Sequence, residues 1–173
     1  MKQYLFILVG TPGSGKTTFS KQLAKETGCI HFSSDRMRKS MFGSTDLFPR
    51  EQSNPWVFGA IDYAIDEMLK AGQTVIYDAN HSFRQDRDKT RSIADALSVQ
   101  PVLIWIKTPL DVAVNRATTR QENLYARKLD ADRVMAHDQK LETPADDEVH
   151  IVINGTKPFS EQYASFTDQL KQL

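Results

Sequence analysis

The chain has 173 residues, of which 40% are apolar and 25% charged, and we expect one globular domain over residues 1–173. Its 22 basic and 22 acidic residues cancel, which excludes a whole-molecule basic field of the kind that gathers nucleic acid. No apolar run reaches the roughly 18 residues of a membrane span, no signal-peptide pattern opens the chain, and Cys29 has no cysteine to pair with. We therefore expect a cytoplasmic protein with no membrane partner, and its oligomeric state stays open.

The first predicted strand, the apolar run from Tyr4 to Val9, leads into the phosphate-binding P-loop pattern G-x-x-x-x-G-K-[ST] at residues 10–17. A helix predicted from Lys16 to Thr27 follows it. Glycines let the backbone approach a ligand closely, and N–H groups at a helix N-terminus form a nest for phosphate. Lys16 is expected to reach the β- and γ-phosphates, and the Thr17 hydroxyl to hold Mg²⁺. The alternative is a glycine-rich turn that binds nothing. The expected nucleotide contacts are Gly13, Ser14, Gly15, Lys16, Thr17 and Thr18.

A short strand from Cys29 to Phe32 comes next, and a polar stretch at the start of a predicted helix over 35–42 follows it. Asp35 is placed there to accept the proton of an attacking hydroxyl, as a catalytic aspartate does in kinases. Arg38, three residues on, shares the same helix face and is suited to hold an anionic group of the substrate. The alternative is that Ser34 or Asp35 only caps the helix.

Asn54-Pro55 predicts the start of a long helix, which Gly72 ends. The run Thr74–Tyr77 then predicts a buried strand, and Asp78 follows directly. This is the Walker-B position, from which an aspartate holds the magnesium shell, and Asn80 beyond it is placed to touch the substrate. No glutamate follows Asp78 to activate water, which favours transfer to an acceptor over hydrolysis. The alternative is a surface cap.

Val102–Ile106 predicts a further strand, and Thr108-Pro109 opens a helix that runs to about Gln121. Arg116 and Arg120 are four residues apart, so they share one helix face. We expect a lid over about 116–133 that closes on the nucleotide, with one arginine stabilising charge on the transferred phosphoryl group. An exposed basic helix is the alternative.

The last strand, Ile151–Ile153, precedes Asn154-Gly155-Thr156, a loop that either flanks the adenine or simply turns the chain. An amphipathic helix from Phe159 to Leu170 follows. The strands are unbroken apolar runs, which is typical of parallel strands covered on both faces. Strands that alternate with helices predict a doubly wound α/β sheet, whose ligands bind at the carboxyl edge where all these polar residues fall.

With these residues laid out, the chain resembles the polynucleotide 5′-kinase branch of the P-loop kinases. The P-loop and Asp35-x-x-Arg38 carry most of the resemblance, and the run 75–80 and the pair Arg116 and Arg120 extend it. The resemblance implies a P-loop NTPase fold with a five-stranded parallel sheet in the order 2-3-1-4-5 and a helical lid. It also implies that Asp35 is the general base, that Arg38 binds the acceptor phosphate, that Arg120 is the lid arginine, and that Arg116 lies near the nucleotide. The chain has no Asp-x-Asp-Gly-Thr phosphatase motif.

We therefore expect a kinase that uses ATP and Mg²⁺ and transfers the γ-phosphoryl group to a hydroxyl acceptor. A nucleic acid 5′-OH end is one such acceptor, and a nucleoside, sugar or antibiotic is the alternative. A third hypothesis is a switch whose nucleotide state controls a partner. The missing glutamate after Asp78 and the absence of a guanine-binding Asn-Lys-x-Asp motif count against the switch.

Overall fold

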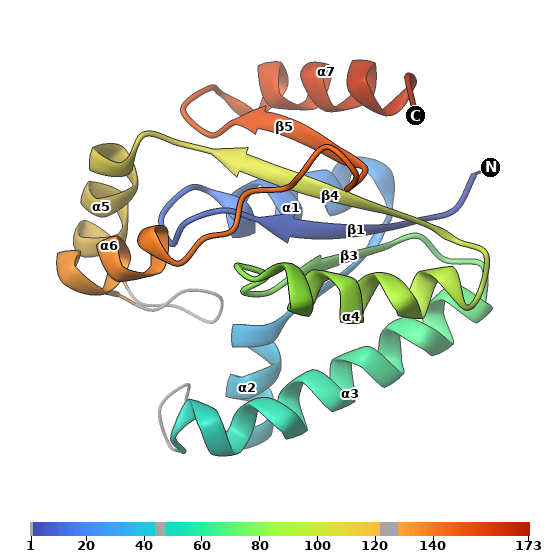
Figure 1. Cartoon of the computed structure of the whole chain (residues 1–173), viewed down its shortest axis with the longest axis horizontal. Coiled ribbons are helices and arrows are strands. Elements are labelled where there is room, and N and C mark those ends of the chain that lie inside the picture. Colours follow the sequence, from blue (N-terminus) through green and yellow to red (C-terminus); the bar gives the residue numbers. More distant parts are fainter. Residues whose placement is uncertain (1, 44–47, 122–127) are drawn as a thin grey trace.

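Within the residues that the computed structural model describes, which are 2–43, 48–121 and 128–173, five strands form one sheet (Figure 1). All neighbours are parallel, and the order is β2-β3-β1-β4-β5. This confirms the predicted fold class. The central strand is β1, in which Leu5 lies opposite Val75 on one side and Pro101 on the other. The strands are β1 (Tyr4–Val9), β2 (Ile30–Ser33), β3 (Val75–Asp78), β4 (Gln100–Lys107) and β5 (His150–Asn154).

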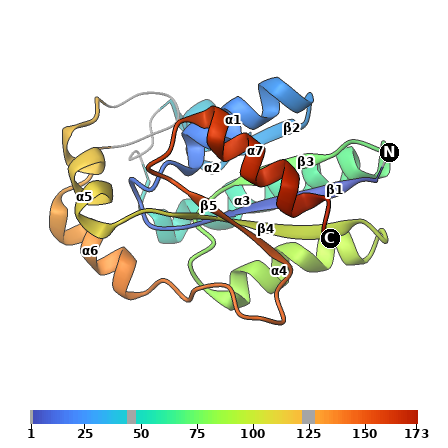
Figure 2. The ribbon, with the colours of Figure 1, turned by 90° about the horizontal axis from the view of Figure 1, so that it is seen from above.

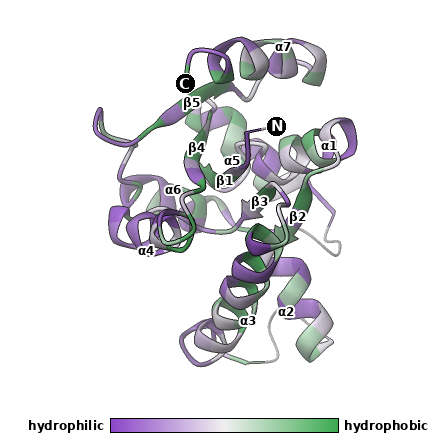
Figure 3. Cartoon of the chain, turned by 90° about the vertical axis from the view of Figure 1, so that its right-hand side faces the viewer, coloured by the Kyte–Doolittle hydropathy of each residue, from purple (hydrophilic) through white to green (hydrophobic). Residues whose placement is uncertain are grey.

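Helices cover both faces of the sheet, as Figures 1 and 2 show. Leu5, Ile7 and Val9 of β1 pack with α3 and α4, whereas the alternating residues Phe6 and Leu8 pack with α1 and α7. Because both faces are buried, the strands are apolar throughout, and Figure 3 shows apolar colour along the strands between the helix layers. The helices are α1 (Lys16–Thr27), α2 (Ser34–Phe42), α3 (Arg50–Lys70), α4 (Arg84–Asp95), α5 (Leu110–Thr119), α6 (Ala131–Gln139) and α7 (Phe159–Leu170).

One predicted helix start and one capping alternative are wrong. The long helix α3 begins at Arg50 and not at Asn54-Pro55, because the carbonyl of Pro49 already accepts hydrogen bonds from the backbone N–H groups of Gln52 and Ser53. The side chain of Ser33 caps α2 by accepting from the N–H of Arg36, so neither Ser34 nor Asp35 is the cap. The carboxylate of Asp35 is therefore available for other contacts.

α4 is absent from the predicted helices because its buried positions are not apolar in the usual way. Its inward face carries Arg87, Thr90 and Ala94, spaced three and four residues apart, and only the last is apolar. The periodicity is helical, but the pattern of hydrophobic residues is not. α6 overlaps the predicted lid over 116–133, of which residues 122–127 lie outside the described residues. No described helix is both long and apolar enough to cross a membrane.

Candidate active site

The phosphate loop joins the end of β1 to the start of α1, as its motif predicts. Gly15 precedes α1 with φ 107°, and Gly13 has φ 87°, both in the left-handed region that favours glycine. A Cβ on Gly13 would lie only 2.1 Å from the carbonyl oxygen of Ala113 in α5, so no other residue fits there. The Ser14 hydroxyl is buried and has no hydrogen-bond partner. Thr17 is half-buried and Thr18 is exposed on the first turn of α1.

The Lys16 ammonium folds back over the loop and donates to the carbonyl oxygens of Gly10 at 2.6 Å and Thr11 at 3.0 Å. Burial lowers the pKa of Lys16 to about 8, with a smaller contribution from the charge of Arg120. The carboxylates of Asp78 and Asp35 act on the same ammonium in the opposite direction. The fold therefore brings the charges of Lys16, Asp35, Asp78 and Arg120 within electrostatic reach of one another, although they come from different elements.

Asp78 ends β3 and is only 5% exposed. Its Oδ2 atom is buried and accepts no hydrogen bond, and His31 Nε2 lies 3.6 Å away. The same His31 nitrogen lies 3.2 Å from the hydroxyl of Ser20, one turn after Thr17. A buried carboxylate oxygen without a donor fits a hydrated cation, which supplies both charge and hydrogen bonds. Asp78 and Thr17 therefore fit a shared role in the magnesium shell.

Magnesium does not need a cage of protein ligands at such a site. Among the described residues, no three histidine, cysteine, aspartate or glutamate side chains cluster to hold a metal. Mg²⁺ is commonly held by one or two protein oxygens together with substrate phosphates and water. The single buried carboxylate of Asp78 matches that donor set.

The structure holds Asp35 and Arg38 against α3 in different ways. Asp35 is 28% exposed, and its Oδ1 accepts from Arg50 Nη2 at 3.1 Å. Arg38 is only 1% exposed, and its guanidinium donates to Ser53 Oγ and, at 2.5 Å, to Asn54 Oδ1. These contacts fix α2 to the first turns of α3. The predicted role of Arg38 on the acceptor phosphate stays a prediction.

Arg116 and the loop after β5 meet at the P-loop. Arg116 Nη1 donates to the carbonyl oxygen of Gly155 at 2.8 Å. A Cβ on Gly155 would come within 2.4 Å of the Ser14 carbonyl oxygen, so this loop packs directly on the phosphate loop. The side chain of Asn154 is exposed, and its Oδ1 accepts from the N–H and hydroxyl of Thr156 within the same turn. The predicted nucleotide neighbours are thus adjacent to one another.

Two polar residues predicted near the substrate have local partners. Asn80, an exposed residue after β3, accepts at its Oδ1 from the Ser82 hydroxyl at 2.6 Å. Arg120 follows the last turn of α5, and its backbone N–H donates to the Arg116 carbonyl. Arg120 is therefore attached to the same helix end as Arg116, at the start of the predicted lid.

One contact to the P-loop was not predicted. The hydroxyl of Thr11, which is a variable position in the P-loop pattern, donates to Asp138 Oδ1 in α6. Asp138 belongs to an acid-rich stretch whose composition is typical of a solvated surface. No sequence spacing relates it to residue 11. The pairing attaches α6 to the phosphate loop.

A phosphate loop after the first strand, a parallel sheet in this order and charged residues at its carboxyl edge together define a P-loop domain with a kinase-like fold. A family model described as an AAA domain matches residues 5–144, and the chain belongs to that family.

A relative of known name and two solved structures are similar to the chain. The L-seryl-tRNA(Sec) kinase of Methanococcus maripaludis is 28% identical over 126 residues, which cover 69% of this chain and 47% of that protein. The chain thus spans about half the length of this relative. A gluconokinase from Sinorhizobium meliloti superposes with a TM-score of 0.70 at 18% identity, covering 98% of this chain and 92% of that one. A chain of the Pnkp1/Rnl/Hen1 RNA repair complex gives 0.70 at 22% identity, covering 81% and 44%. These structures share the fold.

Proposed function

We propose that the chain is an ATP-dependent kinase that transfers the γ-phosphoryl group of MgATP to a hydroxyl of an acceptor. The observation that carries this proposal is the buried Asp78 Oδ2, which has no hydrogen-bond partner and lies within electrostatic reach of the P-loop lysine. A charge in that state raises the free energy of the protein unless a ligand completes it. MgATP supplies both the cation for Asp78 and the phosphates for Lys16.

In the proposed reaction, the Asp35 carboxylate accepts the proton of the acceptor hydroxyl, whose oxygen bonds to the γ-phosphorus. The bond between that phosphorus and the β,γ-bridging oxygen breaks, and its electron pair stays on ADP. Arg50 holds the Asp35 carboxylate through an ion pair, which orients it on the first turn of α2. Lys16 and the P-loop N–H groups neutralise charge on the phosphates, and Arg120 stabilises the group in transfer.

Bound Mg²⁺ would neutralise the negative charge that develops on the phosphates during transfer. Thr17 and Asp78 are the residues that would hold it. Arg116 and the loop at Asn154 would flank the adenine of the nucleotide. The Arg116 guanidinium and Gly155 are joined by a hydrogen bond beside the P-loop. No water-activating glutamate follows Asp78, and this supports transfer to an acceptor.

The named relatives support a kinase but differ in acceptor. One is a kinase of seryl-tRNA, one a gluconokinase, and one belongs to an RNA repair complex. Two acceptor classes therefore compete, a nucleic acid 5′-OH end and a small hydroxyl compound. A panel of both, incubated with γ-labelled ATP, separates them directly by which compound becomes labelled.

The role of Asp35 is tested by Asp35→Asn, which keeps the shape of the side chain and removes the base. Loss of a general base should lower kcat by roughly 10²–10⁴-fold, and calorimetry should find ATP binding unchanged. The matched control is Glu51→Gln, an exposed acid in the first turn of α3. A fully active Asp35→Asn enzyme would overturn the mechanism, and failure of the wild-type chain to bind ATP would overturn the kinase itself.

A further inference from the structure

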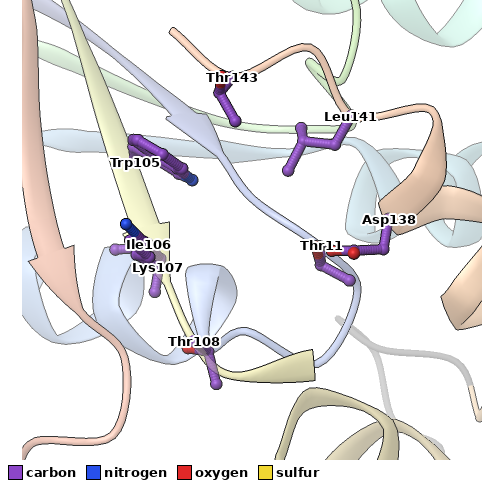
Figure 4. A pocket seen from close by; sticks show the side chains of 8 residues that line it. All are labelled: Thr11, Trp105, Ile106, Lys107, Thr108, Asp138, Leu141 and Thr143. Atoms are coloured by element: carbon purple, nitrogen blue, oxygen red, sulfur yellow. Dashed lines mark hydrogen bonds between the residues drawn. The ribbon is translucent and has the colours of Figure 1, made fainter. Parts of the chain in front are cut away.

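A cavity of about 210 Å³ adjoins the phosphate loop, and none of the residues predicted to bind the nucleotide lines it (Figure 4). Its walls come from the loop itself, from the end of β4 and from the region at and after α6. The residues that line it include Thr11, Trp105, Lys107, Asp138, Leu141 and Thr143. Figure 4 shows Trp105 and Lys107 on the β4 side, and Thr11 and Asp138 in contact across the other.

The cavity is on the same face of the sheet as the proposed base. Trp105 packs against the hydrophobic cluster of the α3–α4 face. Met37 and Phe42 of α2, the helix that carries Asp35, pack against that same cluster. Ile106, which neighbours Gly155, packs instead with the cluster of the α1–α7 face. Ile106 and Thr108 also line the cavity, so the cavity reaches the end of β4 that contacts the loop around Gly155.

The cavity also adjoins the site of transfer. The carbonyl of Thr11 accepts from the Lys16 ammonium at 3.0 Å, while the Thr11 hydroxyl reaches Asp138 beside the cavity. A single residue therefore separates the cavity from the lysine that is expected to bind the γ-phosphate. A ligand in the cavity has its near end at the phosphate loop.

The lining has the chemistry to bind a small hydroxylated anion. The Lys107 ammonium lies 5.2 Å from the centre of the Trp105 ring and has no hydrogen bond or ion pair with any described residue. Lys107 therefore offers a positive charge to a ligand, and the indole beside it offers an apolar wall. Asp138 and Thr143 can hydrogen-bond to hydroxyl groups. The volume is below the roughly 300–1,000 Å³ of pockets for drug-sized ligands, which favours a molecule of about sugar size.

We propose that this cavity binds the anionic end of the phosphoryl acceptor, and that the acceptor is a small polyhydroxylated acid or phosphate ester. Lys107 pairs with the anion, Trp105 packs against the carbon skeleton, and Asp138 accepts from a hydroxyl. This inference rests on the proposed kinase activity and assigns its acceptor to the small-molecule class. The test therefore has one readout for binding to the cavity and another for phosphoryl transfer.

Binding is read from Trp105 itself. The chain has two tryptophans, and Trp56 is a half-exposed residue of α3 that packs with Phe42 and Phe48. Trp56→Phe leaves Trp105 as the only indole. In that background, a six-carbon sugar acid and a hexose 6-phosphate are titrated beside the neutral hexitol and a 5′-OH oligonucleotide. We expect a saturable change in Trp105 emission with one or both anions, and binding of the hexitol at least about tenfold weaker. The two anion arms distinguish a carboxylate from a phosphate.

Transfer is read with γ-labelled ATP and the anion that binds. Lys107→Met should raise the KM for that acceptor about tenfold, since a charge-assisted hydrogen bond is lost, and leave the KM for ATP unchanged. Lys107→Arg should recover most of the affinity. The control is Lys140→Met, an exposed lysine after α6 that does not line the cavity.

The outcomes separate the two proposals. Equal binding of acid and hexitol, no emission change with either anion, or normal kinetics in Lys107→Met would overturn the cavity assignment. Labelling of the oligonucleotide but of no small acid would overturn it too, while the kinase proposal stands. ATP binding without transfer to any compound of the panel would overturn the kinase proposal instead.

Discussion

Two buried charges in this protein have opposite surroundings. Arg87 of α4 is 1% exposed, and it donates to both carboxylate oxygens of the buried Glu148 at 2.8 Å and to the carbonyl of Glu142. Asp78 of β3 is 5% exposed, but its Oδ2 atom accepts no hydrogen bond. A buried charge is costly unless it is paired and hydrogen-bonded. The fold therefore gives Arg87 its hydrogen bonds and countercharge, whereas it leaves one buried oxygen of Asp78 without a hydrogen bond, and we propose that a ligand supplies it.

The difference in hydrogen bonding distinguishes a charge that stabilises the fold, Arg87, from one proposed to act on a ligand, Asp78. Burial acts to raise the pKa of Glu148, but the hydrogen bonds from Arg87 and Ala145 and the positive charge of Arg87 outweigh it, so the pKa lies below its ordinary value. That pair joins α4 to the segment before β5. The charge and the hydrogen bonds of Arg87 are used within the fold and are not offered to a substrate. The arginines of the stretch 84–91 form ion pairs with acidic residues of the same chain. In the sequence alone, this basic cluster after Asp78 resembles a surface that binds a ligand.

The largest effect is expected at Asp78. Asp78→Asn should lower kcat by roughly 10³-fold, the scale found for other charges that act on a transferred phosphoryl group. Without nucleotide, the free energy of unfolding should not fall and should rise by about 1 kcal/mol, because a buried charge whose Oδ2 atom has no hydrogen bond is removed. Initial rates and urea unfolding measure the two quantities. A large loss of stability would mean that Asp78 is a structural charge like Arg87.

The opposite result is expected at Glu148. Glu148→Gln leaves Arg87 buried without its countercharge and should cost about 3–5 kcal/mol of unfolding free energy. The folded fraction should keep the wild-type kcat, since Glu148 bonds to Arg87 and Ala145 and to none of the residues proposed to bind the nucleotide or transfer the phosphoryl group. Asp147→Asn is the matched control, because Asp147 forms an exposed ion pair with Arg84 and its loss should change stability little. If Glu148→Gln unfolds at the same urea concentration as the control, the pair is not what stabilises this region.

MgATP should stabilise the folded chain through Lys16 and Asp78 and not through the pair of Arg87 and Glu148. MgATP at about a hundred times its dissociation constant should stabilise the folded chain by about 2.7 kcal/mol. Lys16→Met should lose this gain, and Asp78→Asn should lose the part that depends on magnesium. Thermal unfolding with and without Mg²⁺ measures both. Glu148→Gln, though less stable, should gain as much as the wild type, and a smaller gain would show that the two regions are coupled.

Much of the fold could be predicted because its signals are local. Strands buried on both faces become continuous apolar runs, and Gly28, with φ 74°, ends α1 where a glycine is expected. The strand order came from the resemblance to known kinases and is confirmed by the pairing of β1 with β3 and β4. α4 was missed because Arg87 occupies a core position, and only its partner 61 residues away explains why.

The candidate site also has one part that local sequence patterns predict and another part that they do not. The P-loop carries its own pattern, and the acids at the strand ends follow from the carboxyl-edge rule for parallel sheets. The contact between Thr11 and Asp138 and the cavity beside it depend on how α6 docks on the phosphate loop. Such contacts join residues that are far apart in the sequence, so neither motif nor periodicity indicates them.

A pH-dependent effect is expected at Lys16, whose ammonium the folded chain buries before nucleotide binds. Its pKa is about 8 in the folded chain and 10.5 in the unfolded one, so between these values the unfolded chain binds the extra proton. The free energy of unfolding should therefore rise with pH from about 8 to 10.5, and the penalty for the buried ammonium is present in full below pH 8.

Urea unfolding of the wild type and Lys16→Met across this pH range isolates the contribution, because the variant lacks the titrating group. The stability deficit of the wild type relative to the variant should shrink as the pH rises. With MgATP bound, the phosphates favour the charged lysine and raise its pKa toward the ordinary value, so the pH dependence should flatten. Parallel pH profiles for the two proteins without nucleotide would mean that the folded chain already satisfies Lys16, and the contrast with Arg87 would then rest on Asp78 alone.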